Sequence, residues 1–531
     1  MSVVSRTIVA GLCAAIMIDA WASDVSFDVH ENMRLQEEAP PLVQLKEAFP
    51  TSILTSFDPH INLETIEAKY EKIGIHFDDL ALLKPHFFSK AIVDHTAKKP
   101  KYWRQRYYFN KEYWGGPGFP IFLMIGGEAA IQPSDVSHEM FHMNTLAIEH
   151  KALLLSLEHR YYGESYPVPD MSVENMQYLT ISQALADIAL FHDHIAEEYE
   201  TPSSKWIAFG GSYPGNLAVW LKQEYPHVVV GSVASSAPVK LVADYKEYME
   251  VVGKDFERGG AECGKSIQNA MQALDDAIVE ALKTPGDVES TLYEVLFPCD
   301  PLQTEKDAFV LETAVKVHFQ TVAQHNDFNP VTVEKTCKYF ASVRHERPLA
   351  QLAGYLAMID PHEKCLLSSF EGYRHSMMSL PEYNSTKFNS KYIARQWLYH
   401  RCTELGFTQT AASGKSIFSP LQFTSFDLAG LNVCKSTFGD AFGFHNVPKA
   451  NKWLGGNKPR TQNVTYTNGN MDPWYPLGLI EQEQLPDDTN SIIFIDGTSH
   501  CRDMYAPIPN DMKTLRRAHK QIEKDVRRYL S

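Results

Sequence analysis

Three side chains in this 531-residue sequence have the types that nucleophilic hydrolysis needs: Ser212, Asp472 and His500. A serine hydroxyl is a weak nucleophile at neutral pH, so it needs a histidine that takes its proton. The histidine in turn needs a carboxylate that fixes its tautomer and stabilises the imidazolium. We therefore predict that these three residues form a catalytic triad.

Ser212 lies in the segment Gly210-Gly-Ser-Tyr-Pro-Gly215, between an apolar run at 206–209 and a helical pattern at 217–221. A sharp glycine turn between a strand and a helix pushes a hydroxyl out of the edge of a sheet. The segment departs from Gly-x-Ser-x-Gly because Pro214 stands in the place of the last glycine. Taken alone, it is also typical of a structural connector.

Asp472 and His500 each follow a segment with a strand pattern, at 464–467 and 491–495. Separately, they are also compatible with a turn aspartate before proline and a surface loop histidine. The order serine, aspartate, histidine, with each residue after a strand, is the order of α/β-hydrolases. This order favours the triad.

An acyl-transfer site also needs two backbone N–H groups that stabilise the oxyanion. We predict that one comes from Tyr213, directly after the nucleophile, and the other from the turn Gly127-Glu128. That turn is equally compatible with simple termination of the strand before it.

Apolar runs of strand length alternate with amphipathic helical patterns around Ser212. A helix with an apolar stripe from Ile181 to Ile195 begins at a predicted capping box, Thr180 to Gln183. Such alternation predicts a mainly parallel sheet with helices on both faces. The predicted strands are 102–109, 120–125, 152–157, 206–209, 227–234, 464–467 and 491–495.

The middle of the chain has a different pattern. We find no clear buried-strand run between about Leu241 and Ser425, and we expect helices at 267–282, 305–325 and 391–404, with a closing helix at 511–530. We therefore predict an α/β fold, an α/β-hydrolase core with a large inserted helical cap domain. The predicted divisions are a signal peptide at 1–22, an N-terminal leader at 23–90, the first part of the core at 91–240, the helical cap insertion at 241–430 and the second part of the core at 431–531.

Composition and the first residues limit partners and location. The formal net charge of −16 argues against a nucleic acid or an anionic membrane as a partner. Residues 8–18 are apolar and Ala20-Trp-Ala22 has the form of a signal-peptidase site, which predicts a signal peptide and a secreted or lysosomal protein. The alternative is an uncleaved anchor. The apolar stretch is short for a membrane span, and we expect no span in the mature chain.

Seven cysteines remain after Cys13 is removed with the signal peptide, and none forms a Cys-x-x-Cys pair. This argues against a zinc ribbon, and we predict neither a metal nor a cofactor. Up to three disulfides are expected, with one thiol left over and the connectivity open. Cys501, beside His500, is either a reactive thiol or a structural residue. Two sequons predict glycosylation at Asn384 and Asn463.

Many ordered motifs together resemble one family, the lysosomal Pro-Xaa carboxypeptidase, dipeptidyl peptidase II and thymus-specific serine protease family of serine peptidases. The resemblance runs from about Val93 to the loop of His500. Its motifs are Gln105-Arg-Tyr-Tyr108, Ile125-Gly-Gly-Glu128, Glu158-His-Arg-Tyr-Tyr-Gly163, Gly210-Gly-Ser-Tyr-Pro-Gly215, Ala234-Ser-Ser-Ala-Pro238 and Asn468-Gly-Asn-Met-Asp-Pro-Trp474.

The resemblance implies an α/β-hydrolase core with an inserted helical domain, a secreted or acidic compartment, peptide substrates and the same triad. It is also compatible with a homodimer. By the same resemblance, Trp474, Asn216 and Met504 stand at positions of the S1 pocket. Asn216 places a polar amide where family members that cleave after proline have an apolar side chain, which argues against strict Pro-Xaa specificity.

We therefore expect a serine exopeptidase that works through an acyl-enzyme, of the Pro-Xaa carboxypeptidase or dipeptidyl peptidase type. Glu128 and Glu404 are either ligands of a substrate amino group or structural residues. The alternatives are a secreted esterase or lipase on the same fold, and a non-catalytic binding protein on that scaffold. Whether cleavage starts from the amino or the carboxyl end stays open, since it depends on which end the helical domain blocks.

Overall fold

A computed structural model describes residues 83–137, 141–378, 391–485 and 487–531. The predicted signal peptide, most of the predicted leader and the predicted glycosylation site Asn384 lie outside these residues. Within them, no helix combines the length and the apolar character that a membrane crossing requires.

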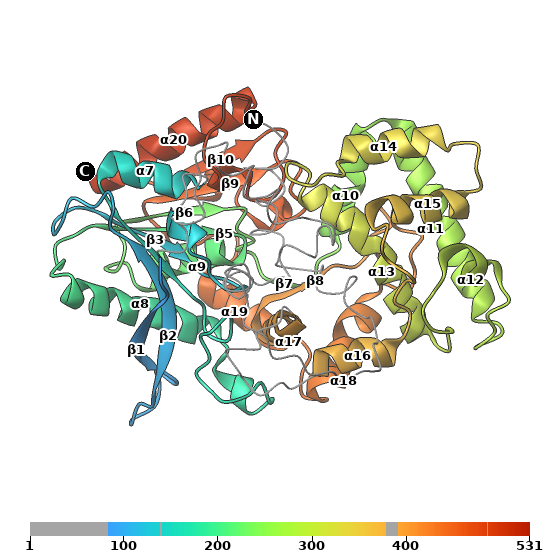
Figure 1. The fold of residues 1–531 in the computed structure, drawn as a ribbon, viewed down its shortest axis with the longest axis horizontal. Helices are drawn as coiled ribbons and strands as arrows, with labels where there is room; N and C mark the ends of the chain where they lie inside the picture. Colours follow the sequence, from blue (N-terminus) through green and yellow to red (C-terminus); the bar gives the residue numbers. More distant parts are fainter. Residues whose placement is uncertain (1–82, 138–140, 379–390, 486) are drawn as a thin grey trace, which may run out of the picture.

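The centre of the molecule is one sheet of eight strands in the order β1-β2-β4-β3-β5-β6-β9-β10 (Figure 1). The six strands from β4 to β10 are parallel, whereas β1 and β2 are antiparallel to their neighbours. The strands are β1 His86–Ile92, β2 Tyr102–Asn110, β3 Ile121–Ile125, β4 Leu153–Leu157, β5 Trp206–Gly211, β6 Gly231–Ser235, β9 Val464–Gly469 and β10 Ser491–Ile495. This topology is that of an α/β-hydrolase, so the predicted fold class is confirmed.

The predicted strands are found with small changes of boundary. All five residues of both β3 and β4 are buried, as expected for continuous apolar runs between two helical layers. The strand predicted at 227–234 begins only at Gly231, because Val228 donates its N–H to Tyr225 in a turn. The sheet also includes β1, which starts inside the segment predicted as a leader and pairs with β2.

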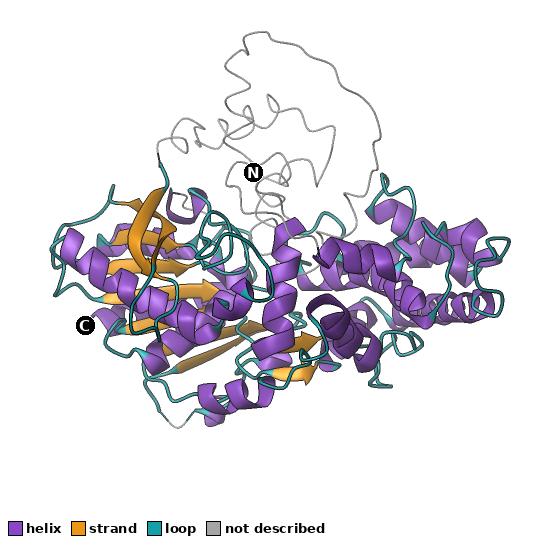
Figure 2. Cartoon of the chain, turned by 90° about the horizontal axis from the view of Figure 1, so that it is seen from below, coloured by secondary structure: helices purple, strands orange, loops and turns teal. Residues whose placement is uncertain are grey.

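Helices cover both faces of the sheet (Figures 1 and 2). Helices α8 and α9 pack on one face, and α7 and α20 pack on the other. The flanking helices are α6 Ser134–Ser137, α7 His142–His150, α8 Ile181–Glu198, α9 Tyr213–Glu224 and α20 Lys513–Leu530.

Helix α8 begins after Thr180, as predicted, and its whole apolar stripe is buried. The hydroxyl of Thr180 accepts the N–H of Gln183 at 3.3 Å, which forms one half of the predicted capping box. The other half is replaced, because the amide of Gln183 bonds instead to His95 N and to Asp94. The connection between β1 and β2, which contains Asp94 and His95, therefore binds the Gln183 side chain that would otherwise complete the capping box.

Between β6 and β9 the described chain is mainly helical. Its α-helices are α10 Glu247–Arg258, α11 Ala261–Ala281, α12 Thr291–Leu296, α13 Glu305–Gln324, α14 Val333–Ser342, α15 Pro348–Ile359, α16 Phe370–Met378, α17 Lys391–His400, α18 Val433–Phe438 and α19 Val447–Leu454. Helices α10 to α15 form a group beside the sheet (Figure 1). A short two-stranded pair, β7 Val242–Asp244 and β8 Gly406–Thr408, was not predicted because three residues carry too little pattern.

Three disulfides link segments of this helical region. This number equals the predicted maximum of three disulfides. Cys263–Cys337 joins α11 to α14, Cys299–Cys365 joins two loops, and Cys402–Cys434 joins the π-helical turn Arg401–Leu405 to α18. Cys501 is buried and lies outside the three disulfides. Such a set of disulfides fits an oxidising compartment.

Candidate active site

Ser212 is the single residue between strand β5 and helix α9, as the glycine turn predicts. Its backbone is at φ 60° and ψ −130°, a region that costs a non-glycine residue about 1–3 kcal/mol. The turn is held by the N–H of Ser212, which donates to Ser235 O at 2.9 Å. A Cβ at Gly210 would collide with the Pro214 carbonyl, and one at Gly215 would lie 2.9 Å from Ser235 O. The glycines are therefore required because backbones approach closely.

Asp472 and His500 are brought together at the ends of the neighbouring strands β9 and β10. The ring atom Nδ1 of His500 lies 2.9 Å from Oδ1 of Asp472, and both side chains are fully buried. The same carboxylate oxygen accepts the N–H of Trp474 at 2.9 Å. Since Nδ1–H donates to the carboxylate, Nε2 is the ring atom that can accept a proton from a nucleophile.

The loop of His500 lies against the serine turn. A Cβ at Gly211, next to Ser212, would lie 2.9 Å from Sγ of Cys501, next to His500. The N–H of Cys501 also donates to the hydroxyl of Ser236, at the end of β6, at 2.9 Å. The residues adjoining the predicted nucleophile and the predicted base are thus in contact at one edge of the sheet.

Asp503 anchors this loop, and the sequence motifs assigned it no role. Its carboxylate accepts the hydroxyls of Ser235 at 2.6 Å and Thr467 at 2.7 Å. Burial raises the pKa of Asp503, although both hydroxyl hydrogen bonds act to lower it. In the sequence, this role is indicated by an acidic residue three positions after His500 and by hydroxyl residues at the ends of two of the predicted strands, Ser235 and Thr467.

The predicted oxyanion donors lie on two adjoining turns. Tyr213 is the first residue of α9, where backbone N–H groups have no acceptor within the helix. Gly127 follows β3 and packs on the ring of Pro214, so closely that a Cβ at Gly127 would overlap it. This contact places the turn Gly127-Glu128 beside the start of α9.

Buried polar side chains surround the ring of Tyr213. Its hydroxyl lies 3.1 Å from Nε2 of His159, and burial lowers the pKa of His159 to about 4. Burial raises the pKa of Tyr213 well above its usual value, and the charges of Glu404 and Glu128 raise it further. Both the imidazole and the phenol are therefore neutral over the physiological range.

The two glutamates considered as ligands of a substrate amino group differ in their surroundings. Glu128 is fully buried. Glu404 accepts the N–H of Ile181, at the start of α8, at 2.8 Å, and burial raises its pKa to about 7. The hydrogen bond of Glu404 is a structural one, because it satisfies an N–H group of the first turn of α8.

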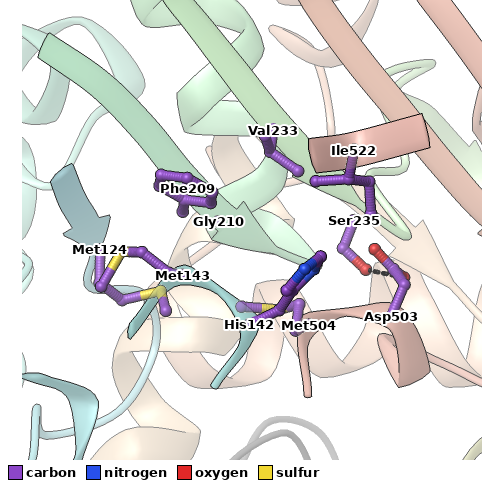
Figure 3. A pocket seen from close by; sticks show the side chains of 10 residues that line it. All are labelled: Met124, His142, Met143, Phe209, Gly210, Val233, Ser235, Asp503, Met504 and Ile522. Atoms are coloured by element: carbon purple, nitrogen blue, oxygen red, sulfur yellow. Dashed lines mark hydrogen bonds between the residues drawn. The ribbon is translucent and has the colours of Figure 1, made fainter. Parts of the chain in front are cut away.

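The three predicted substrate residues lie close to the predicted triad in different surroundings. The indole of Trp474 is buried with its centroid 6.4 Å from that of the His500 ring, and Asn216 is buried and donates to Pro238 O at 3.2 Å. Met504 packs on the α7 and α20 side of the sheet, and its sulfur lies against Gly211, next to Ser212. There it lines a cavity of about 20 Å³ that also contacts Phe209 (Figure 3).

Two further predictions concern a glycan at Asn463 and the lack of a metal site. Asn463 is half-buried, and its side-chain amide donates to Val230 O at 3.2 Å, so a glycan there would share the amide nitrogen with this bond. Across the described ranges, no group of three or more histidine, cysteine or carboxylate side chains is arranged to hold a metal ion.

Residues 92–522 match the family described as Serine carboxypeptidase S28. The chain is 29% identical over 499 residues to the thymus-specific serine protease of Homo sapiens, covering 91% of this chain and 93% of that protein. It is 28% identical over 437 residues to the lysosomal Pro-X carboxypeptidase of Mus musculus, covering 77% and 82%. It is also 28% identical over 476 residues to a putative serine protease of Caenorhabditis elegans, covering 84% of each.

The family match covers most of the chain, including the serine turn and the strands that precede Asp472 and His500. The sheet order and the turn at Ser212 agree with it. The protein is therefore a serine-type peptidase that belongs to the serine carboxypeptidase S28 family.

Proposed function

We propose that the protein is a serine exopeptidase whose catalytic triad is Ser212, Asp472 and His500. The observation that carries this proposal is the buried hydrogen bond between His500 and Asp472. The loop of His500 also contacts the strained turn at Ser212. Ser212 attacks the peptide carbonyl, and Nε2 of His500 takes the hydroxyl proton and then gives it to the leaving amine. Water hydrolyses the resulting acyl-enzyme by the same proton transfers in reverse.

The negative charge of the tetrahedral intermediate is stabilised in this proposal by the N–H of Tyr213 and by an N–H of the turn Gly127-Glu128. The contact between Gly127 and Pro214 supports this arrangement, because the turn Gly127-Glu128 lies next to the start of α9, which follows Ser212. A backbone donor at the start of α9 also benefits from the positive end of the helix dipole.

The substrate class follows from the family, and the exopeptidase character is proposed from the relatives. One relative is named a lysosomal Pro-X carboxypeptidase, which supports exopeptidase action, and another is named a thymus-specific serine protease. Trp474 has geometric support as an S1 residue because its ring lies next to His500, and Met504 has it because its sulfur lies against Gly211, next to Ser212. Contacts of Asn216 and Met504 with the substrate stay predictions.

We also propose that the chain enters the secretory route through the signal peptide 1–22 and acts in a secreted or lysosomal location. The three disulfides support this, and so does the name of the lysosomal relatives. Amino-terminal sequencing of the secreted protein tests the cleavage site. A homodimer is part of the proposal, and light scattering of the purified protein tests it.

Digestion of a mixed peptide library at pH 5 and pH 7, followed by mass spectrometry, tests the function. We expect loss of one C-terminal residue or of N-terminal dipeptides, and we expect Ser212→Ala to remove this activity. Ser232→Ala is the matched control, since Ser232 is a buried serine of the next strand whose hydroxyl bonds to Ala218 O. Mainly internal cuts would refute the exopeptidase assignment, and an active Ser212→Ala variant would refute the triad.

A further inference from the structure

Gln324 is a buried residue at the end of helix α13, where the helical region meets the two loops of the proposed triad. Its backbone carbonyl accepts the N–H of His500 at 3.0 Å. Its side-chain oxygen Oε1 accepts the indole N–H of Trp474 at 2.9 Å. One residue of the helical region is thus bonded to both the histidine loop and the aspartate loop.

The bond to Trp474 leads directly to the carboxylate of the proposed triad. The backbone N–H of Trp474 donates to Oδ1 of Asp472 at 2.9 Å, and this oxygen also accepts Nδ1 of His500. The position of the Trp474 residue therefore helps to set the orientation of the Asp472 carboxylate. Hydrogen bonds in such a buried network strengthen one another and fix one arrangement of the side chains.

The side chain of Gln324 is held from a second direction. Oε1 also accepts the hydroxyl of Tyr248, on α10, at 2.6 Å, and Nε2 lies 3.2 Å from Nε2 of His325. The rings of Tyr248 and Trp474 pack edge to face with centroids 5.3 Å apart. An amide oxygen that accepts two buried donors has a fixed orientation, and its loss would leave both donors without that acceptor.

The segment that follows α13 attaches to the histidine loop at a second point. The carboxylate of Asp327 accepts the N–H of Ser499 at 2.7 Å and its hydroxyl at 2.9 Å. The end of α13 therefore holds two successive residues of the loop, Ser499 and His500. This arrangement makes the helical region part of the frame of the site.

We propose that Gln324 is a positioning residue of the peptidase, which orients the Asp472–His500 pair through Trp474 and couples it to the helical region. The proposal rests on the proposed triad. The side chain of Gln324 acts only through its neighbours, because its oxygen bonds to Trp474 and Tyr248. Removal of the Gln324 side-chain oxygen should therefore change how well His500 works as a base. The fold should stay in place.

The test compares Gln324→Met with Gln324→Glu, which keeps an oxygen acceptor at the same position. Gln320→Met is the matched control, because Gln320 is a buried glutamine one turn earlier in α13 that bonds to Gln409. The measured quantity is the second-order rate constant of labelling by a small fluorophosphonate between pH 4 and pH 8. This probe reports the nucleophile without requiring a peptide to occupy the substrate pocket.

We expect Gln324→Met to lower the labelling rate by roughly 10- to 100-fold, the size of effect that a misplaced catalytic group produces. The acidic limb of its pH profile should move to lower pH, because a poorly oriented carboxylate stabilises the imidazolium less. Gln324→Glu should stay within about threefold of the wild type since an acceptor remains, and Gln320→Met should match the wild type.

The proposal is overturned if Gln324→Met behaves as Gln320→Met does. It is also overturned if Gln324→Met and Gln324→Glu lose the same fraction of activity with an unmoved acidic limb, because that result indicates general damage to the fold. Labelling of Ser212→Ala in the same experiment separates the two proposals. A labelled Ser212→Ala variant contradicts the triad itself, whereas an unlabelled one leaves only the role of Gln324 at issue.

Discussion

The imidazole of His500 and the carboxylate of Asp472 lie 2.9 Å apart, and neither side chain is exposed to solvent. The two residues are 28 positions apart in the chain and come from the ends of adjacent parallel strands. Their pairing follows from the order of β9 and β10 in the sheet, because the carboxyl ends of parallel strands meet at one edge.

Replacing Asp472 by asparagine should lower kcat by roughly 10⁴-fold, because the amide would stabilise the wrong tautomer of His500. The shape of the side chain is kept, so the melting temperature should change little. Peptide turnover measured at saturating substrate checks this. Asp496→Asn is the control, since Asp496 is an exposed aspartate at the end of β10. Comparable activity in the two variants would show that Asp472 has no role in catalysis.

Replacing Gly210 by alanine should destabilise the protein by about 1–3 kcal/mol, the usual cost of forcing extra atoms into a packed core. The new Cβ would collide with the carbonyl of Pro214 and displace the turn that carries Ser212. Urea unfolding followed by fluorescence measures the free energy. Gly372→Ala is the control. Its Cβ would meet only Ser369 at 3.5 Å at an exposed position of α16, and we expect a gain of about 0.5–1 kcal/mol. Equal effects of the two substitutions would contradict the close packing at the turn.

Replacing Asp187 by asparagine should cost about 3–5 kcal/mol, because it leaves the buried guanidinium of Arg160 without its carboxylate. Burial acts to raise the pKa of Asp187, but the charge of Arg160 and the hydrogen bonds from His95 and Arg160 outweigh it and lower the pKa. The stability that a lowered carboxylate pKa provides is complete above the unfolded value of about 3.9 and declines as the pH falls toward the folded value.

The loss of stability in Asp187→Asn should therefore be no smaller at pH 5 than at pH 7 and should shrink only below about pH 4. Unfolding curves at these three pH values measure it. Asp193→Asn, an exposed position of the same helix, should have little effect at any of them. A loss that is already smaller at pH 5 than at pH 7 would contradict the lowered pKa.

The sequence predicts most of the sheet, because apolar runs such as 121–125 and 153–157 have one strong pattern and are buried on both faces. It also predicts the turn at Ser212 and the partners Asp472 and His500, since chain order constrains them. It does not predict β7 and β8, which are short, or the second partner of Gln183, which depends on a distant loop. Met504 packs against Gly211 and Trp474 packs beside His500, and Gln324 reaches the site from a helix that carries no sequence motif. Only the folded chain shows these relationships.

The assignment of Ser212 as the nucleophile is tested by the mass of the intact protein and of its peptides after reaction with a fluorophosphonate. We predict one adduct, on the peptide that contains Ser212, with no adduct in Ser212→Ala and a greatly slowed reaction in His500→Ala. An adduct on a different serine, or equal labelling of the wild type and Ser212→Ala, would contradict the assignment of Ser212 as the nucleophile.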